Sequence, residues 1–243
     1  MNKEVFREIL RMWRSVYFTD TLAIVCQCAA LVAGIQYYRK RKEGLYFIIF
    51  AIAWLLDFTV SIYITKYIRV VLNDPEFSIL VEETSNVIVT ITEYTCFSYF
   101  FYHSMHQIKN KKLVIFFSAF FILPVILFFV RLLSGFPAQS IRHLSFTISS
   151  IEMILLLISS LLYFFELFLN KPLEHLLGKP SFWIVSALSL YCILVIPFFL
   201  IADRFIYPNS AVLIIGFTIH LISFCLLFLA LVKAFSLNKK LTE

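Results

Sequence analysis

Four ionisable residues lie deep inside long apolar stretches of this chain: Asp57, Glu93, Glu152 and His220. A charge at the centre of a bilayer costs roughly 2.5–3.5 kcal/mol on insertion scales, so such groups pair with one another or share protons. Ionisable residues at this depth are candidates for function by default. Because three carboxyls and one imidazole can hold a proton or a ligand between them, these four residues are the predicted ligand- or proton-binding site.

The stretch at 80–105 carries polar side chains along one face of its predicted helix. At about 100° per residue they fall within a sector of about 80°. A polar stripe this narrow is expected to face other helices, because lipid offers it no hydrogen-bonding partner. The residues of this stripe are Glu82, Asn86, Thr90, Glu93 and Ser104.

A second stripe runs along the stretch at 144–169, within a sector of about 100°. Its residues are Ser145, Ser149, Glu152, Ser159, Tyr163 and Glu166. Two interpretations remain open for the acids of both stripes. In the first they donate hydrogen bonds that hold the helices together, at an average of about 0.6 kcal/mol each. In the second the cluster binds a ligand or a proton and reports it.

The remaining reactive residue types do not form a recognisable catalytic or metal site. His103 and His106 share a helical face, but a third ligand of suitable spacing is missing nearby, so the sequence predicts no metal. The five cysteines all lie inside apolar stretches, where a free thiol behaves as a small hydrophobic group, and their odd number argues against a disulfide framework. The sequence therefore predicts no catalytic residues, no cofactor and no enzyme.

The composition shows what surrounds these polar residues. Hydrophobic residues make up 61% of the chain and charged residues 15%. Soluble domains carry roughly 45–50% hydrophobic and about 25% charged residues. A soluble core of this size has no room for so much apolar surface, whereas a bilayer solvates it. The apolar stretches are continuous and do not alternate with polar residues, so they predict membrane-spanning helices and not barrel strands.

Seven such stretches are long enough to cross about 30 Å of hydrocarbon. The predicted fold is therefore all-α: one seven-transmembrane helix bundle at 16–235, preceded by an amphipathic segment at 1–15 and followed by a short cytoplasmic tail at 236–243. The predicted spans are 16–38, 45–66, 80–105, 113–133, 144–169, 181–203 and 210–235.

Positive charges are distributed unequally between the two ends of these spans. Because positive residues favour the cytoplasm, the larger group predicts an inner-membrane protein with its N-terminus outside and its C-terminus inside. The net charge of +6 then reflects topology and anionic lipid, and does not point to nucleic acid. Twelve cations lie at one end, namely Arg39, Lys40, Arg41, Lys42, Lys109, Lys111, Lys112, Lys171, Lys179, Lys233, Lys239 and Lys240. Nine lie at the other, namely Lys3, Arg7, Arg11, Arg14, Lys66, Arg69, Arg131, Arg142 and Arg204.

The loop at 170–180 on the predicted cytoplasmic side has helix start and stop signals. Pro172 suits a first turn, and Gly178 followed by Pro180 ends it, so one or two turns of interfacial helix are expected. This loop is the predicted docking surface for a cytoplasmic or membrane signalling partner, alongside the lipid bilayer itself.

Three sequence runs resemble a family of small uncharacterised seven-helix membrane proteins common in Bacteroidota. They are the run from Ile91 to Tyr102, the run from Leu161 through Pro180-Ser-Phe-Trp183 to Tyr191, and the pair Ile219-His220. The resemblance covers about residues 45–235 and implies a seven-helix membrane fold. It implies no activity, because the family carries none that can be transferred.

The sequence thus favours a membrane protein with a receptor-like or sensory role that uses its internal polar cluster. A small transporter or proton-coupled channel using the same acids is the alternative. An intramembrane enzyme is a third, disfavoured by the missing metal ligand and the missing nucleophile–base pair. The scarcity of glycine, with five in the whole chain, also favours stiff receptor-like helices over an alternating-access transporter.

Overall fold

The computed structural model describes residues 3–170, 176–202 and 210–237, and every regular element within them is helical. The all-α prediction is therefore confirmed for this part of the chain. The elements are α1 (Lys3–Arg41), α2 (Leu45–Thr59), the π-helical segment η1 (Val60–Ile64), α3 (Thr65–Val70), α4 (Pro75–Ser104), α5 (Ile108–Leu133), α6 (Ala138–Asn170), α7 (Pro180–Ala202) and α8 (Ser210–Ser236).

Five helical segments are long and apolar enough to cross a membrane, which is the character of a multi-pass membrane protein. They are Thr21–Arg41 in α1, Ile108–Leu133, Ala138–Leu169, Pro180–Leu200 and Thr218–Ser236 in α8. The other two predicted spans, at 45–66 and 80–105, are helical but do not meet these criteria of length and apolarity. The first is interrupted, since α2 ends after 15 residues at η1, and the second carries the acids of the polar stripe.

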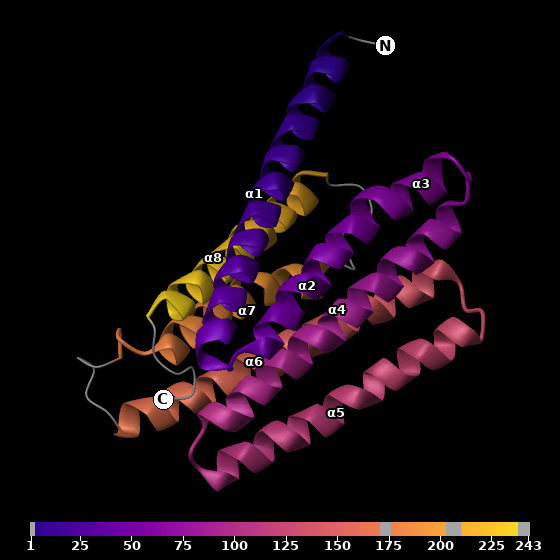
Figure 1. Cartoon of the computed structure of the whole chain (residues 1–243). Coiled ribbons are helices and arrows are strands. Elements are labelled where there is room, and N and C mark those ends of the chain that lie inside the picture. Colours follow the sequence, from indigo (N-terminus) through magenta and orange to yellow (C-terminus); the bar gives the residue numbers. More distant parts are fainter. Residues whose placement is uncertain (1–2, 171–175, 203–209, 238–243) are drawn as a thin grey trace.

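The structure describes the backbone of most of the predicted N-terminal segment, but little of the predicted C-terminal tail. Helix α1 runs without a break from Lys3 to Arg41, so the predicted segment at 1–15 is, from Lys3 onward, a helical extension of the first span. Figure 1 shows this part of α1 projecting beyond the other helices. Its amphipathic character stays a prediction.

The predicted helix in the 170–180 loop falls largely on 171–175, and the predicted tail at 236–243 falls largely on 238–243. Both segments lie outside the described residues.

Local sequence explains where several helices begin or end. The Asp74 side chain accepts a hydrogen bond of 2.9 Å from the backbone N–H of Phe77, and Pro75 occupies the first turn of α4, where its missing N–H removes no helical hydrogen bond. Gly44 precedes α2 with φ 81° and Gly135 follows α5 with φ 70°. Both turns need the left-handed backbone that glycine adopts without strain.

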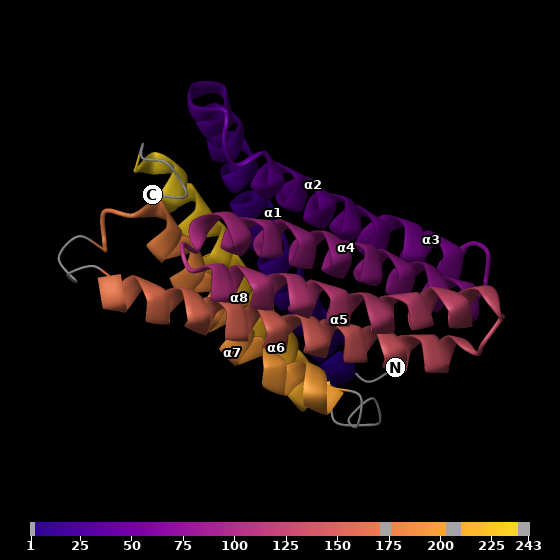
Figure 2. The same cartoon turned by 90° about the horizontal axis from the view of Figure 1, so that it is seen from below.

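Six helices form a closed ring in the order α1, α2, α4, α6, α7 and α8, with α8 returning to α1. Helix α5 lies outside the ring against α4 and α6, and it is the least buried of the five candidate spans. Figure 2 shows α2 with α3, α4, α5 and α6 running alongside one another, while α1, α7 and α8 cross them steeply. The polar stripes of α4 and α6 therefore meet inside the ring.

Aromatic side chains fill the ring at the end where α4 and α8 finish. Phe50 stacks on Phe228 with ring centroids 5.3 Å apart and packs edge-on against Phe97 at the same distance. Phe100 and Phe101 extend this layer and are fully buried. We call these five residues the aromatic floor, because they close one end of the ring interior.

Candidate functional site

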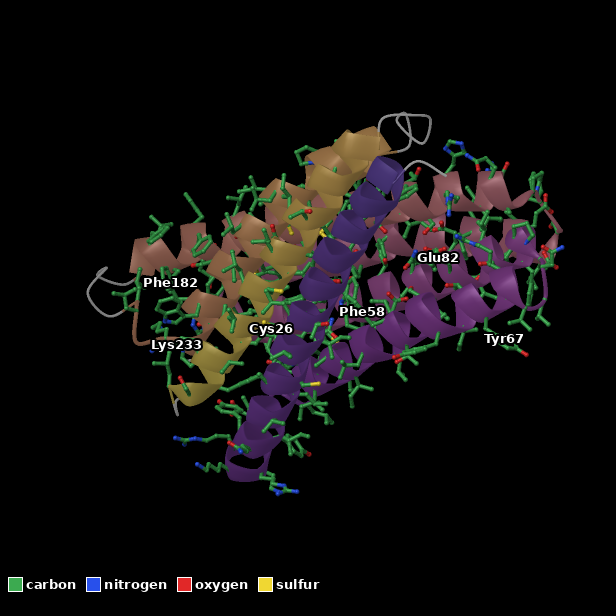
Figure 3. The ribbon with its side chains drawn as sticks, turned by 90° about the horizontal axis from the view of Figure 1, so that it is seen from above. Cys26, Phe58, Tyr67, Glu82, Phe182 and Lys233 are labelled. Atoms are coloured by element: carbon green, nitrogen blue, oxygen red, sulfur yellow. The ribbon has the colours of Figure 1, made fainter. Side chains whose placement is uncertain are left out.

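A cavity of about 540 Å³ occupies the ring interior on the other side of the aromatic floor. Its wall is built from α2, η1, α4, α6, α7 and α8, so nearly the whole ring contributes to it. Small-molecule sites are concave pockets of about 300–1,000 Å³, and this cavity falls within that range. Figure 3 shows Glu82 and Phe58, which line it, well separated from Phe182 and Lys233 toward the opposite end of the bundle.

The structure brings the four predicted site residues to this one cavity. Asp57 comes from α2, Glu93 from α4, Glu152 from α6 and His220 from α8. Each helix reaches the cavity near the middle of its own length or closer to its predicted outer end. Three further predicted residues of the α4 stripe share the wall, namely Glu82, Asn86 and Thr90.

The inner end of the cavity holds two deeply buried carboxyl groups. Glu93 and Glu152 are each 1% exposed, and both line the cavity. The indole Nε1 of Trp54 donates a hydrogen bond of 3.1 Å to Oε2 of Glu93. Within the described residues, Oε1 of Glu93, Oε1 of Glu152 and the Tyr191 hydroxyl have no hydrogen-bonding partner. Buried polar atoms are normally paired, so these three are the candidate contacts for a ligand or a water molecule.

His220 lies among aromatic rings at the same level. Its ring centroid is 5.7 Å from that of Tyr191, 6.0 Å from Phe199 and 6.4 Å from Trp54. Neither ion pair found in the described residues includes His220, and its Nδ1 has no partner there. The histidine and the carboxyls thus share a wall without forming the pair that their chemistry would allow.

The acids nearer the predicted outer end of the cavity do have partners. Arg142 Nε donates a hydrogen bond of 2.8 Å to Oε1 of Glu83, in an ion pair whose carboxyl is buried. Oε2 of Glu82 lies 3.9 Å from Nη2 of Arg69, whose side chain is more exposed than that of Arg142.

The partner of Asp57 is a hydroxyl group and not a cation, because its Oδ1 accepts a hydrogen bond of 2.6 Å from Ser85. The inner pair differs from these outer acids because Oε1 of Glu93 and Oε1 of Glu152 have no partner among the described residues.

Sequence reasoning missed Glu83 and Arg142. Glu83 is one position from Glu82, so it lies about 100° around α4 from the predicted stripe. Arg142 precedes the predicted fifth span and enters the sequence prediction only as a cation for topology. The signal available was an acid and a base near the ends of two spans on the same side of the membrane.

Tyr163 and Glu166 belong to the predicted α6 stripe but lie away from the cavity. The Tyr163 hydroxyl donates a hydrogen bond of 2.7 Å to the Ser181 hydroxyl. Glu166 accepts hydrogen bonds from the backbone N–H groups of His106 and Gln107, and from the side chain of Asn110 at 2.8 Å. Glu166 therefore secures the turn between α4 and α5 and the start of α5.

No cluster of three or more metal-binding side chains occurs among the residues that the structure describes, and His103 and His106 are exposed. No family model, curated protein or solved structure matches the chain. The cavity combines features that small-molecule sites share: aromatic rings in a concave space, beside a few oxygen atoms that have no partner among the described residues.

Proposed function

We propose that this chain is a non-enzymatic, seven-helix protein of the inner membrane with a receptor-like or sensory role. The observation that carries the proposal is the cavity in which Asp57, Glu93, Glu152 and His220 meet. A receptor needs a preformed pocket with a few polar groups left for its ligand, and this cavity supplies both. Its signalling partner would dock on the predicted cytoplasmic side, for which the sequence segment 170–180 is the candidate docking surface.

The seven-span part of the proposal is supported by where the polar residues of α4 face. Helix α4 is too acidic to qualify as a span by composition, yet Glu83 and Glu93 are buried in the ring while Ile88 and Tyr99 are exposed on its outside. A helix whose acids point inward presents an apolar surface to lipid. We therefore include α4, and the continuous rod of α2, η1 and α3, among the membrane-spanning segments.

The aromatic floor supports a receptor over a channel. A path through the protein along α4 would have to join Glu82 to Ser104. Ser104 is buried and does not line the cavity. Phe97, Phe100 and Phe101 lie between them on the same helix and are fully buried. A cavity closed at one end retains a ligand and does not conduct one.

A small proton-coupled transporter is the second candidate, and irregular helices in the cavity wall favour it. The π-helical segment η1 contributes Ser61 to the wall, and π segments occur often at functional sites. Pro197 interrupts the hydrogen-bond ladder of α7 just before Phe198 and Phe199, which also line the cavity. Either feature allows the wall to move.

A matched pair of cysteine variants tests whether the cavity is an accessible site. Ser149 and Ser160 are both buried serines of α6, but only Ser149 lines the cavity. With the native cysteines replaced by alanine, Ser149→Cys is expected to react with methyl methanethiosulfonate at least about tenfold faster than Ser160→Cys, because reagent reaches only the cavity wall. Equal protection of both thiols, in variants that elute as folded protein, would overturn the proposed site.

Proton flux separates the receptor from the transporter. Purified protein in liposomes that carry an internal pH-sensitive dye is expected to leave an imposed pH gradient intact, because the aromatic floor closes the cavity. A gradient that collapses with the wild-type protein and persists with Glu93→Gln would contradict the receptor and establish the proton-coupled alternative.

A further inference from the structure

The inner end of the cavity also indicates what class of ligand it accepts. Resting on the proposed binding function, we propose that the ligand is a small primary amine with an apolar body, whose ammonium group lies between Glu93 and Glu152. Charge, unpaired atoms and the aromatic wall each point to this class.

The charge of the wall excludes an anion and favours a cation. Five acidic residues line the cavity, but the only Lys or Arg among the described residues of its wall is Arg142, which is already paired with Glu83. Within the described residues no Lys or Arg forms an ion pair with Glu93 or Glu152. A buried carboxylate without a counter-charge is costly, and a ligand ammonium supplies that charge where the protein does not.

The unpaired atoms match the donors of an ammonium group. A primary ammonium donates three hydrogen bonds and accepts none. The wall offers Oε1 of Glu93 and Oε1 of Glu152 as acceptors, and these atoms and the Tyr191 hydroxyl have no hydrogen-bonding partner within the part of the chain that the structure describes. Trp54 holds the second oxygen of Glu93, so this carboxyl is oriented before the ligand arrives.

Aromatic side chains line the space that the apolar body of the ligand would occupy. Trp54, Tyr191 and Phe199 line the cavity around His220, and Phe58 and Phe146 line it farther along. Ring faces attract a nearby cation and also pack against an apolar body. An amine that carries a ring or an alkyl chain satisfies both parts of the wall at once.

The fluorescence of Trp54 provides the test, since the only other tryptophans, Trp13 and Trp183, can be replaced by phenylalanine. Three probes of similar size differ in charge: phenethylamine, phenethyl alcohol and phenylacetate. We expect phenethylamine to half-saturate the fluorescence change at a concentration at least about tenfold below that of the alcohol, as charge-assisted hydrogen bonds require, and phenylacetate to give no change.

Substitutions test whether the preference for phenethylamine arises from the carboxyl groups of the cavity. Glu93→Gln keeps an acceptor for Trp54 but removes the charge, and together with Glu152→Gln it should abolish the preference for the amine. Glu76→Gln, an exposed carboxyl at the start of α4, should leave that preference unchanged.

Three results would overturn the proposal that the ligand is an amine. An equal response to amine and alcohol would show that the carboxyls act as neutral hydrogen-bonding groups. A stronger response to phenylacetate would show that Arg142 governs binding. Absence of any response in protein whose Ser149→Cys thiol still reacts would reject the amine while leaving the accessible cavity in place. Loss of that thiol reactivity itself would instead reject the proposed binding site.

Discussion

The buried acids of this protein differ in what satisfies them, and this difference assigns their roles. Glu166 binds backbone amides at a turn, and Glu83 binds the side chain of Arg142. Glu93 is satisfied at one oxygen by Trp54, while Oε1 of Glu93 and of Glu152 remain unpaired within the described residues. The first two acids therefore hold the fold together, whereas the inner pair is the proposed contact for a ligand.

The ion pair of Glu83 and Arg142 gives a prediction at this scale. Arg142→Met leaves a buried carboxyl without its partner, so we expect the free energy of unfolding in mixed micelles to fall by about 3 kcal/mol. The double variant Glu83→Gln/Arg142→Met removes both charges and should recover most of this loss.

Glu76→Gln serves as the control for that cycle, because its carboxyl is exposed. Surface substitutions of this kind are expected to change the free energy of unfolding by no more than about 0.5 kcal/mol. A double variant as unstable as Arg142→Met alone would show that the two side chains do not stabilise the fold as a pair.

At the scale of elements, the ring helices and α5 contribute differently. Helix α4 packs on α2 and α6 and contributes three rings of the aromatic floor and the buried acids Glu83 and Glu93 to the ring interior. Helix α5 covers α4 and α6 from outside and exposes most of its large side chains. Gly216 shows how tightly the ring closes, because a methyl group there would collide with the ring of Phe198 on α7. Packing inside the ring, and not apolarity alone, positions the site.

Two phenylalanine variants test this contrast, since Phe97 in the aromatic floor is fully buried and Phe116 on α5 is exposed. Phe97→Ala should lower the free energy of unfolding by about 2 kcal/mol, because the unfolded chain stays in lipid and mainly the cavity term remains. Phe116→Ala should change it by less than about 0.5 kcal/mol, as surface substitutions do. Equal losses in the mixed-micelle titration would contradict the division into ring and outer helix.

For the whole molecule, the start of α1 and the end of α8 lie on opposite sides of the bundle (Figure 1). At the end where α8 finishes, Lys233 lies 6.0 Å from the ring of Trp183 and Lys111 lies 5.3 Å from that of Tyr102. Lysines that rest on aromatic rings are typical of a membrane–water interface. This end is the one that the charge distribution assigns to the cytoplasm.

Labelling of single cysteines tests the orientation and the crossing of α4 together. Glu76, in the first turn of α4, and Lys109, at the start of α5, are exposed positions near the two ends of α4. In a cysteine-free background, an impermeant maleimide should label Glu76→Cys in intact cells and Lys109→Cys only after permeabilisation. The reverse pattern would invert the orientation, and labelling of both sites from one side would show that α4 does not cross.

Sequence alone was sufficient for the helical class and the membrane character, since both depend on local properties: apolar length, charge density and the helical period. The polar stripes of α4 and α6 were predictable for the same reason, and Glu93 and Glu152 are buried as a stripe facing inward requires. The start of α4, with Asp74 and Pro75, also follows from neighbouring residues.

Only the tertiary structure decided which stripe residues meet. Asp57, Glu93, Glu152 and His220 share a cavity because the ring order brings α2, α4, α6 and α8 around one space, whereas Glu166, on the same stripe as Glu152, lies at a turn beyond the aromatic floor. A periodic pattern gives the direction of a side chain around its own helix. It carries no information on the depth or the neighbour at which that side chain finds a partner, because those depend on how distant helices pack.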